Sequence, residues 1–564
     1  SYTPPDFSDA SAGVAAASTQ RWLVLKENPI FNEKMLGILS SNGTLTIQRW
    51  SGSSFEANEW SSSGITAANS AYRGFDVAYE DSTGRSLIVY YNGAAGSISY
   101  RVWSASSTAW AVGETANALT GLTGTIYWVK LTPKRNSPEI MLTVLDSNSH
   151  IYSKLWNGSI WVDSTAYTIT TGATVNDMEV FSADWESLSG RCLVAYGGSS
   201  NMSSAIFDGA SWSAGPGYAL GSNARVRVIS LKADPNSNRM GFTTVTNRNS
   251  WVVALWSGSG WTAGPTTDSN IGTITPYLTD AAWERKSEKL LIVCGDQDSS
   301  YIDYVTWQNS SWSVASLDNA AMDTQSWSGV IHSLNLVSDP NTNNIMAVGS
   351  DVNGELRTRL WNHSSNSFTG GAVMNSIALS SYAHAPFMFS FDRYDADAPV
   401  IVDNQAGDNT WRNANTGFYS IYFEDYGISG LSHFQIKAMT GPNQTGSLVL
   451  DWTTQVSDIN AQEYTADWQL TNETFDALYQ GVNFISVRVF DVAGNQQSLT
   501  DAFYVRKDTV PPAAINNLSV TSNGLQNRVA LSWTAPGDNG SSETITSGYY
   551  ICLLYTSDAA DEED

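Results

Sequence analysis

A pair of aromatic residues recurs seven times along this chain at nearly constant intervals, and this repeat constrains the fold more than any other feature. Each leading aromatic is followed five or seven residues later by a second one, usually in a Trp-x-Gly-x-x-Trp setting. Successive leading residues are 53, 53, 51, 49, 51 and 54 positions apart. The pairs are Trp50/Phe55, Trp103/Trp110, Trp156/Trp161, Phe207/Trp212, Trp256/Trp261, Trp307/Trp312 and Trp361/Phe368. A period near fifty residues is typical of β-propellers and similar arrays.

Each repeat contains short strand-like segments separated by turn residues. In the third repeat, residues 128–131, 140–145 and 151–156 are rich in apolar, β-branched and aromatic residues, and Asn157-Gly158 leads into a further segment at Trp161. Such a pattern predicts antiparallel strands joined by tight turns. Four strands per repeat make one propeller blade, which buries its faces only by stacking against its neighbours. We find no sustained apolar stripe of helical period.

The repeats alternate between two kinds. Odd repeats carry a turn such as Asp234-Pro235-Asn236 or Asp339-Pro340-Asn341, whereas even repeats carry the related segments 78–93, 183–198 and 281–296. This alternation indicates duplication of a two-blade block of roughly one hundred residues. Residues 386–392 look like the first strand of an eighth repeat. We therefore predict an all-β chain with a seven-bladed β-propeller over residues 1–395, the extra strand completing the ring, and an eight-bladed propeller as the alternative.

The pattern changes after residue 395, where a short linker leads into a second domain at 396–507. Polar and apolar residues alternate from Phe484 to Phe490, which predicts a half-buried strand, and the segment from Asp491 to Asn495 predicts the hairpin turn after it. This stretch resembles the bacterial Ig-like domains, whose last hairpin often carries such a turn, and so implies a β-sandwich. We expect Asp491 to cap its own turn rather than to bind calcium.

A stiff spacer containing Pro511-Pro512 precedes the last recognisable segment, residues 508–551. Prolines before its first strand, Trp533 in the second and Tyr549-Tyr550 opening the third resemble the start of a fibronectin type III domain. A complete sandwich of this kind needs ~100 residues. We therefore expect this module to be truncated and Trp533 to be partly solvated.

The sequence leads to one expectation for the N-terminal end of the chain and another for the C-terminal end. The chain starts at Ser1 and shows no basic or apolar leader segment. Residues 552–564 resemble a translated sequencing adapter, with a genuine acidic tail as the alternative. On the adapter interpretation the natural protein continues beyond residue 551, and the sequence at hand says nothing about targeting.

The composition excludes several classes of partner. The formal net charge is −25, or −25 + 5 = −20 without the five acidic residues of the tail, and no basic patch is visible. Such a chain repels nucleic acid and anionic lipid. Only 15% of residues are charged, and no apolar run approaches the ~18 residues of a membrane span. We expect no nucleic-acid partner, no membrane insertion and an extracellular or cell-surface location; the oligomeric state is open.

Reactive chemistry is almost absent from the sequence. Cys192 and Cys294 occupy equivalent strands two blades apart, so we expect buried thiols rather than a disulfide. The five histidines are scattered, and no nucleophile elbow, phosphate-binding loop or dinucleotide motif is present. We predict no catalytic residue, no cofactor and no metal site. A propeller glycosidase is the alternative enzyme, although the Asp-box of sialidase-type propellers has only a loose echo at residues 41–44.

The aromatic pairs are the best candidates for ligand contact. Their hairpins resemble those of six-bladed fucose-type lectin propellers in the turn and the rings, but not in the Arg and Glu of the pocket. The candidate contacts are Trp103, Trp156, Trp161, Trp256, Trp261, Trp307 and Trp312. The competing interpretation, which regular recurrence favours, is that the rings fill the space between blades and each bury ~150–250 Å².

Two functions follow from these features and resemblances. The first is a non-catalytic surface or secreted protein for binding or adhesion, with the propeller as the recognition face and the Ig-like and fibronectin modules as spacer. The second is a carbohydrate-binding, lectin-like propeller, or the targeting part of a glycan-active enzyme. The partner would be a surface protein in the first case and a glycan in the second. A catalytic propeller would require acids and arginines clustered at the mouth of its channel.

Overall fold

The computed structural model divides the chain into two compact units, residues 1–395 and 396–564. It describes residues 18–552 apart from short gaps, so that the tail at 553–564 lies outside the described residues. The gaps are at 53, 57–58, 64, 66–71, 120–121, 123, 163–164, 174–177, 199–200, 222–223, 270, 272–276, 296–298, 341, 376–386, 392–394, 396, 406–408, 427–428, 460, 523–527 and 538–547. No helix in the described part of the chain is both long and apolar enough to cross a membrane.

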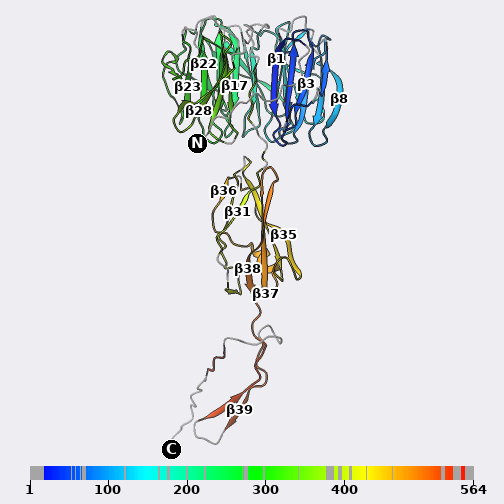
Figure 1. The fold of residues 1–564 in the computed structure, drawn as a ribbon, viewed down its shortest axis with the longest axis vertical. Coiled ribbons are helices and arrows are strands. Elements are labelled where there is room, and N and C mark those ends of the chain that lie inside the picture. The colour runs from blue at the N-terminus through cyan, green and yellow to red at the C-terminus, as the bar shows by residue number, and fades with distance from the viewer. Residues whose placement is uncertain are drawn as a thin grey trace, which may run out of the picture. The chain divides into compact units, whose positions relative to one another are not determined.

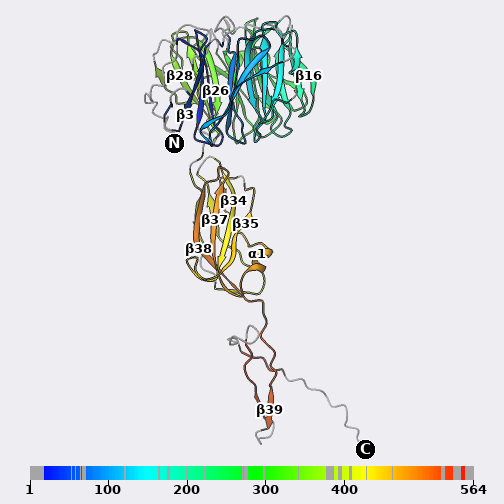
Figure 2. The ribbon, with the colours of Figure 1, turned by 90° about the vertical axis from the view of Figure 1, so that its right-hand side faces the viewer.

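The first unit consists of seven antiparallel sheets, each built from strands that follow one another along the chain. Figures 1 and 2 show these sheets standing side by side. The first sheet contains β1 (Gln20–Glu27), β2 (Lys34–Ser40), β3 (Leu45–Trp50) and β4 (Trp60–Ser62). The second contains β5 (Phe75–Tyr79), β6 (Arg85–Tyr91), β7 (Ser97–Ser104) and β8 (Ala109–Ala118). The third contains β9 (Ile126–Pro133), β10 (Ile140–Asp146), β11 (Ile151–Trp156) and β12 (Tyr167–Thr170).

The remaining four sheets repeat this plan, and the last two gain a fifth strand. The fourth sheet contains β13 (Phe181–Trp185), β14 (Cys192–Gly197), β15 (Asn201–Phe207) and β16 (Trp212–Ala219). The fifth contains β17 (Val226–Ala233), β18 (Met240–Thr246), β19 (Trp251–Trp256) and β20 (Trp261–Ala263). The sixth contains β21 (Thr279–Trp283), β22 (Leu290–Gly295), β23 (Ile302–Gln308), β24 (Ser311–Trp312) and, after the 3₁₀ turn η1 (Leu317–Asn319), β25 (Ala321–Met322). The seventh contains β26 (Ile331–Ser338), β27 (Ile345–Asp351), β28 (Leu356–Asn362), β29 (Ser367–Thr369) and β30 (Val373–Asn375).

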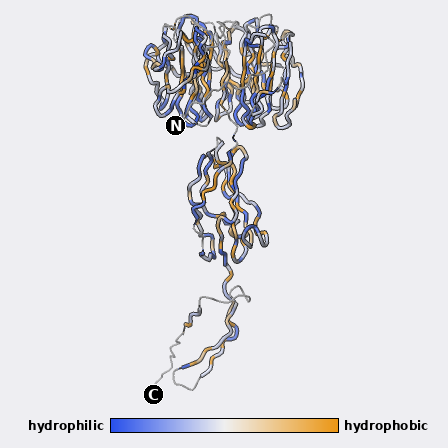
Figure 3. The backbone as a smooth tube through the Cα atoms, in the orientation of Figure 1, coloured by the Kyte–Doolittle hydropathy of each residue, from blue (hydrophilic) through white to orange (hydrophobic). Residues whose placement is uncertain are grey.

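The second and third strands of each sheet form the core between neighbouring sheets. Every residue of β10, β18, β19 and β22 is buried, and Figure 3 shows hydrophobic segments concentrated along the strands of this unit. Residues with both faces covered are apolar or β-branched because each sheet packs against two neighbours. Cys192 and Cys294 are free thiols within this core, 0% and 1% exposed.

The segment expected to form an eighth strand does not do so in its described part. Residues 387–391 carry no strand pairing. Instead Phe387 packs on Met346, Val348 and Leu360 of the seventh sheet, so the prediction of a strand here is wrong. Phe389 and Phe391 pack against the same cluster, so the alternating phenylalanines place their rings on this sheet.

The second unit contains a pair of facing sheets. One is built from β31 (Val400–Asp403), β33 (Ile421–Glu424) and β36 (Glu463–Tyr464). The other has the order β32-β38-β37-β34-β35, formed by β32 (Trp411–Arg412), β38 (Gln496–Lys507), β37 (Gly481–Asp491), β34 (Leu431–Met439) and β35 (Leu448–Val456). A single core that includes Phe423, Phe434 and Val487 lies between them. The helix α1 (Asn472–Ala477) starts at Thr471, whose hydroxyl accepts from the backbone N–H of Thr474 at 3.1 Å.

The strand and turn predicted near residue 490 are confirmed. Along β37, Ile485, Val487 and Val489 are buried. Of the residues that alternate with them, only Ser486 is buried as well. The Asp491 carboxylate accepts from the Asn495 backbone N–H at 2.7 Å, which is the predicted turn cap. The Asn495 amide also donates to it at 2.8 Å. The buried Asp425 brings a second carboxylate within 4.8 Å, and an acidic pair held in this way does not by itself define a cation site.

The last described segment has little core of its own. β39 (Ser519–Ser522) and β40 (Val529–Ser532) form a two-stranded sheet. Val520 and Val529 are each 60% exposed, and Trp533 is half-buried with its ring edge-on to Tyr549 at 5.1 Å. An isolated hairpin with its apolar side chains in water is marginally stable.

Candidate functional site

The leading rings of the aromatic pairs lie inside the first unit. Trp103, Trp156, Trp256 and Trp307 are between 1% and 6% exposed. Trp103, Trp156 and Trp256 each meet the next aromatic of their hairpin edge to face, as Trp156 and Trp161 do at 5.5 Å. Trp161 is 8% exposed, whereas Trp261 and Trp312 are half-buried. This burial favours packing between sheets as the role of the leading rings.

Buried carboxylates hold the indole N–H groups of these rings across the sheet boundaries. Trp156 donates to Glu80 at 2.8 Å, Trp256 to Glu186 at 2.6 Å and Trp361 to Glu284 at 2.8 Å. In each pair the carboxylate belongs to an even-numbered sheet and the indole to the next one. Trp103 donates to Glu33 of the first sheet at 3.0 Å. The recurring tryptophan therefore has a recurring polar partner inside the protein.

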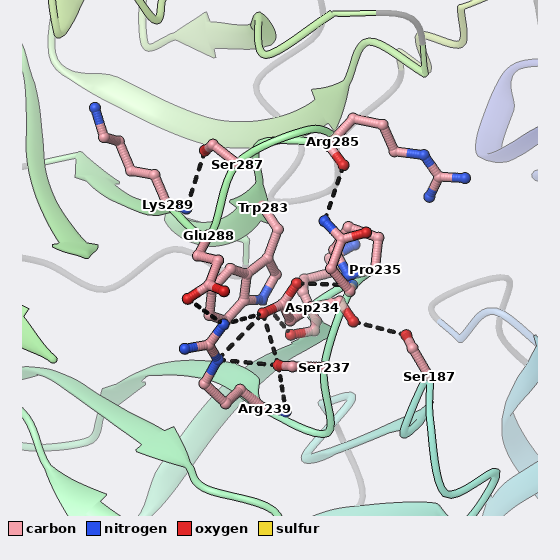
Figure 4. Close-up of polar contacts among 12 residues, drawn as sticks. Ser187, Asp234, Pro235, Ser237, Arg239, Trp283, Arg285, Ser287, Glu288 and Lys289 are labelled. Atoms are coloured by element: carbon pink, nitrogen blue, oxygen red, sulfur yellow. Dashed lines mark hydrogen bonds and ion pairs between the residues drawn. The ribbon is translucent and has the colours of Figure 1, made fainter. Parts of the chain in front are cut away.

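Two of these carboxylates, Glu80 and Glu186, are paired with an arginine five residues later, a feature that sequence reasoning missed. Glu186 binds Arg191 at 2.7 Å. In the fifth sheet Asp234 binds Arg239 at 2.8 Å, and Arg239 also binds Glu288 at 2.9 Å. Figure 4 shows this arginine directed toward both carboxylates beside the Trp283 ring. The signal was present in the sequence as an acid and an arginine bracketing one hairpin turn.

A cavity of about 230 Å³ lies where the first strands of all seven sheets meet. Its lining includes residues of β1, β5, β9, β13, β17, β21 and β26, together with Phe387 and Met388. We call it the central cavity. A cavity of about 320 Å³ adjoins it and shares Lys26 and Lys232 with it, and another of about 280 Å³ shares Glu27 and Arg285 with that second cavity. Sites for small molecules have about 300–1,000 Å³.

An ion-pair network occupies one end of the central cavity. Arg73 contacts Glu179 at 2.8 Å and Asp76 at 3.5 Å. Tyr277 donates its hydroxyl to Glu179 at 3.3 Å, and Lys130 lies 3.9 Å from the same carboxylate. Lys130 is 28% exposed and Arg73 14%, so both reach the space of the cavity.

Burial changes the proton affinities of this network. It lowers the pKa of Lys130; Glu179 opposes this change, while Lys232 and Arg73 add to it. Burial would also lower the pKa of Arg73, but Glu179 and Asp76 outweigh it and the pKa is raised. Burial raises the pKa of Tyr277 well above its usual range, and Glu179 adds to the rise. The phenol therefore stays protonated at neutral pH and serves as a hydrogen-bond donor rather than an activated nucleophile.

The aspartates of the cavity wall bind backbone groups of the next sheet. Asp76 accepts from the backbone N–H of Leu131 at 2.7 Å, and Asp280 from that of Leu336 at 2.8 Å. Ser182 occupies the equivalent place in the fourth sheet and accepts from Leu231 at 3.3 Å. These side chains connect each even sheet to the odd sheet after it. Their carboxylates are thereby committed to the fold.

Aromatic side chains close part of the wall. Trp22 lies edge-on to Trp128 at 5.4 Å and to Tyr277 at 6.2 Å. Phe387 lines the cavity from the segment after the seventh sheet. The central cavity thus combines ring surfaces with fixed donors and acceptors, the combination that orients a polar ligand.

No protein-family model matches the chain. Among curated proteins, "Calcium-activated chloride channel regulator 4" of Homo sapiens is 24% identical over 193 residues, which are 31% of this chain and 19% of that protein. The chain therefore spans about a fifth of the length of that relative.

Solved structures similar to this chain include lectins. BP39L lectin from Burkholderia pseudomallei is 11% identical with a TM-score of 0.44, over 63% of this chain and 98% of that chain. AofleA from Arthrobotrys oligospora is 16% identical with a TM-score of 0.32, over 53% and 85% of the two chains. The six-bladed fungal lectin of Aleuria aurantia is 12% identical with a TM-score of 0.31, over 55% and 96%. Scores below 0.5 carry no inference about the ligand of this chain.

Proposed function

We propose that this is a non-catalytic extracellular or cell-surface protein whose first unit, a seven-bladed propeller, binds carbohydrate in the central cavity. Residues 396–507, as an Ig-like sandwich, and 508–551, as the start of a fibronectin type III module, would act as a spacer. The central cavity carries the proposal, because together with the adjoining cavity of about 320 Å³ it reaches the size of a small-molecule site, and its wall offers aromatic edges beside fixed polar groups.

The geometry favours a sugar over a protein as the ligand of this site. A stable protein interface buries about 1,200–2,000 Å² of surface, which a cavity of about 230 Å³ cannot supply. A sugar offers several hydroxyl groups to donors and acceptors such as Tyr277, Asn335 and Lys130, all of which line the cavity. The raised pKa of Tyr277 favours binding over catalysis at this position.

Blocking the central cavity tests the proposal. The full chain is first screened on a glycan array, where we expect saturable binding to at least one glycan. Asn335→Trp, which places an indole in the cavity wall, should then weaken binding by about tenfold or more, equivalent to about 1.4 kcal/mol. Trp312→Ala, at a half-buried ring of an aromatic pair, is the matched control and should bind as the wild type does.

Other outcomes of the screen are equally informative. Loss of binding in Trp312→Ala but not in Asn335→Trp would move the site to the aromatic hairpins. An array without any binding by folded protein would contradict carbohydrate recognition. A surface protein would then be the partner to seek.

A further inference from the structure

The central cavity concentrates positive charge within a strongly acidic protein. The chain has 29 basic and 54 acidic residues. Four basic side chains, Lys26, Arg73, Lys130 and Lys232, nevertheless line one cavity with three acidic ones. Basic groups gathered in a partly enclosed site attract anions, because low-dielectric walls concentrate their field.

Two of these lysines form no close ion pair in the described part of the chain, although the Asp184 carboxylate interacts electrostatically with Lys232. Neither Lys26 nor Lys232 forms an ion pair or a side-chain hydrogen bond there, whereas Arg73, Arg191 and Arg239 are each bound to a carboxylate. Both lysines line the central cavity and the adjoining one of about 320 Å³. Holding an ammonium group away from bulk water without a partner costs free energy.

The two lysines occupy equivalent places in different sheets. Each lies two residues before the first residue of a hairpin turn, Asn28 in the first sheet and Asp234 in the fifth. Because the strands β1 and β17 both face the cavity, the two ammonium groups approach the same space from two sheets. This is the arrangement of a cleft that recognises one anionic group from two sides.

The nearby carboxylates of Asp184 and Asp280 are held by hydrogen bonds from the fold rather than by close contact with the two lysines. Asp184 accepts from the backbone N–H groups of Trp185 and Ala233, both at 2.8 Å. Asp280 accepts from the Ser230 hydroxyl at 2.5 Å and from the Leu336 backbone at 2.8 Å. These carboxylates already bind the fold, so the lysines are the groups left to meet a ligand. Burial lowers the pKa of Lys130, and the neighbouring charges of Lys232 and Arg73 add to this change.

We propose that the central cavity selects acidic saccharides, and that Lys26 and Lys232 bind the carboxylate of the sugar. The inference rests on the proposed carbohydrate binding and narrows its ligand class. Asn335, Ser182 and the Tyr277 hydroxyl line the same space and are placed to hydrogen-bond the ring hydroxyls. The Trp22 side chain supplies an apolar wall for the ring.

The test compares each acidic sugar with its uncharged methyl ester. Glucuronic acid, galacturonic acid and N-acetylneuraminic acid are titrated calorimetrically into the full chain, each beside its methyl ester. At least one acid should bind about tenfold or more tightly than its ester. Raising the salt concentration should weaken the binding of the acid more than the binding of the ester.

Matched variants locate the effect. Lys26→Met/Lys232→Met keeps the length of both side chains and should lower affinity for the acid by about tenfold or more, with little change for the ester. Lys286→Met, at an exposed turn, is the control and should behave as the wild type does. A thermal melt confirms that each variant is folded.

The failures are distinguishable. Equal binding of acid and ester by the wild type would overturn the selection for acidic sugars and leave carbohydrate binding standing, without needing any variant. If acetate bound as tightly as the sugar acid, the site would recognise a carboxylate alone, and the proposal of a saccharide ligand would be overturned. Unchanged affinity in the double variant would place the anion elsewhere. Binding of no sugar, on the array or in solution, would end both proposals.

Discussion

Replacing Glu186 by alanine is expected to lower the free energy of unfolding of the first unit by about 3–5 kcal/mol. The side chain is 2% exposed. Its carboxylate accepts from the Trp256 indole at 2.6 Å and binds Arg191 at 2.7 and 2.8 Å. Truncation leaves the buried Trp256 indole N–H without its acceptor and the Arg191 guanidinium, 32% exposed, without its counter-charge, and an unpaired buried group bears its whole desolvation cost.

Calorimetric unfolding of the full chain measures the effect. Glu288→Ala is the matched control, because Glu288 also binds an arginine, at 2.9 Å, but is 63% exposed. An exposed pair contributes at most about 1 kcal/mol, so this variant should unfold close to the wild type. If the two variants lost similar free energies of unfolding, the buried carboxylate would contribute no more to stability than an exposed ion pair.

Replacing Asp323 by alanine is the second change with a large expected effect, again about 3–5 kcal/mol of unfolding free energy. Its carboxylate holds Arg359 in two bonds of 2.5 and 2.6 Å, with both side chains at most 1% exposed. Arg359 belongs to β28 of the seventh sheet, and Asp323 follows β25 of the sixth. The pair therefore joins two sheets, and removing Asp323 leaves the Arg359 guanidinium buried without its counter-charge.

Comparing the single and the double variant with the wild type separates pairing from packing. Asp323→Leu/Arg359→Met removes both charges, so we expect it to be more stable than Asp323→Leu alone, because apolar replacements of buried ion pairs are often neutral. Urea unfolding followed by tryptophan fluorescence gives the three free energies. A double variant less stable than the single one would contradict the account.

The sequence predicts the repeated sheets well, because a strand and its turn are local. Asn157-Gly158 and the turn at Asp491 carry their geometry in neighbouring residues. The alternation along β37 was likewise readable, apart from the buried Ser486. The segment at 387–391 failed because alternating phenylalanines look the same whether they extend a sheet or pack on its face.

The central cavity could not be predicted in the same way. Arg73 and Glu179 are 106 positions apart and belong to different repeats, and they do not recur at every equivalent position. A periodic search finds what is repeated, such as the tryptophans, and overlooks groups that differ between repeats. Only the assembly of seven sheets brings these side chains together.

One set of polar links runs from each even sheet to the odd one after it, through Glu80, Glu186 and Glu284 to an indole and through Asp76 and Asp280 to a backbone N–H. Inserting or deleting one sheet would place two sheets of the same kind side by side, so that their buried carboxylates would face groups other than their present partners. Inserting or deleting two keeps every such junction. Proteins with this architecture should therefore differ in their number of repeats by two rather than by one. Their chain lengths should accordingly differ by about two repeat lengths, not by one.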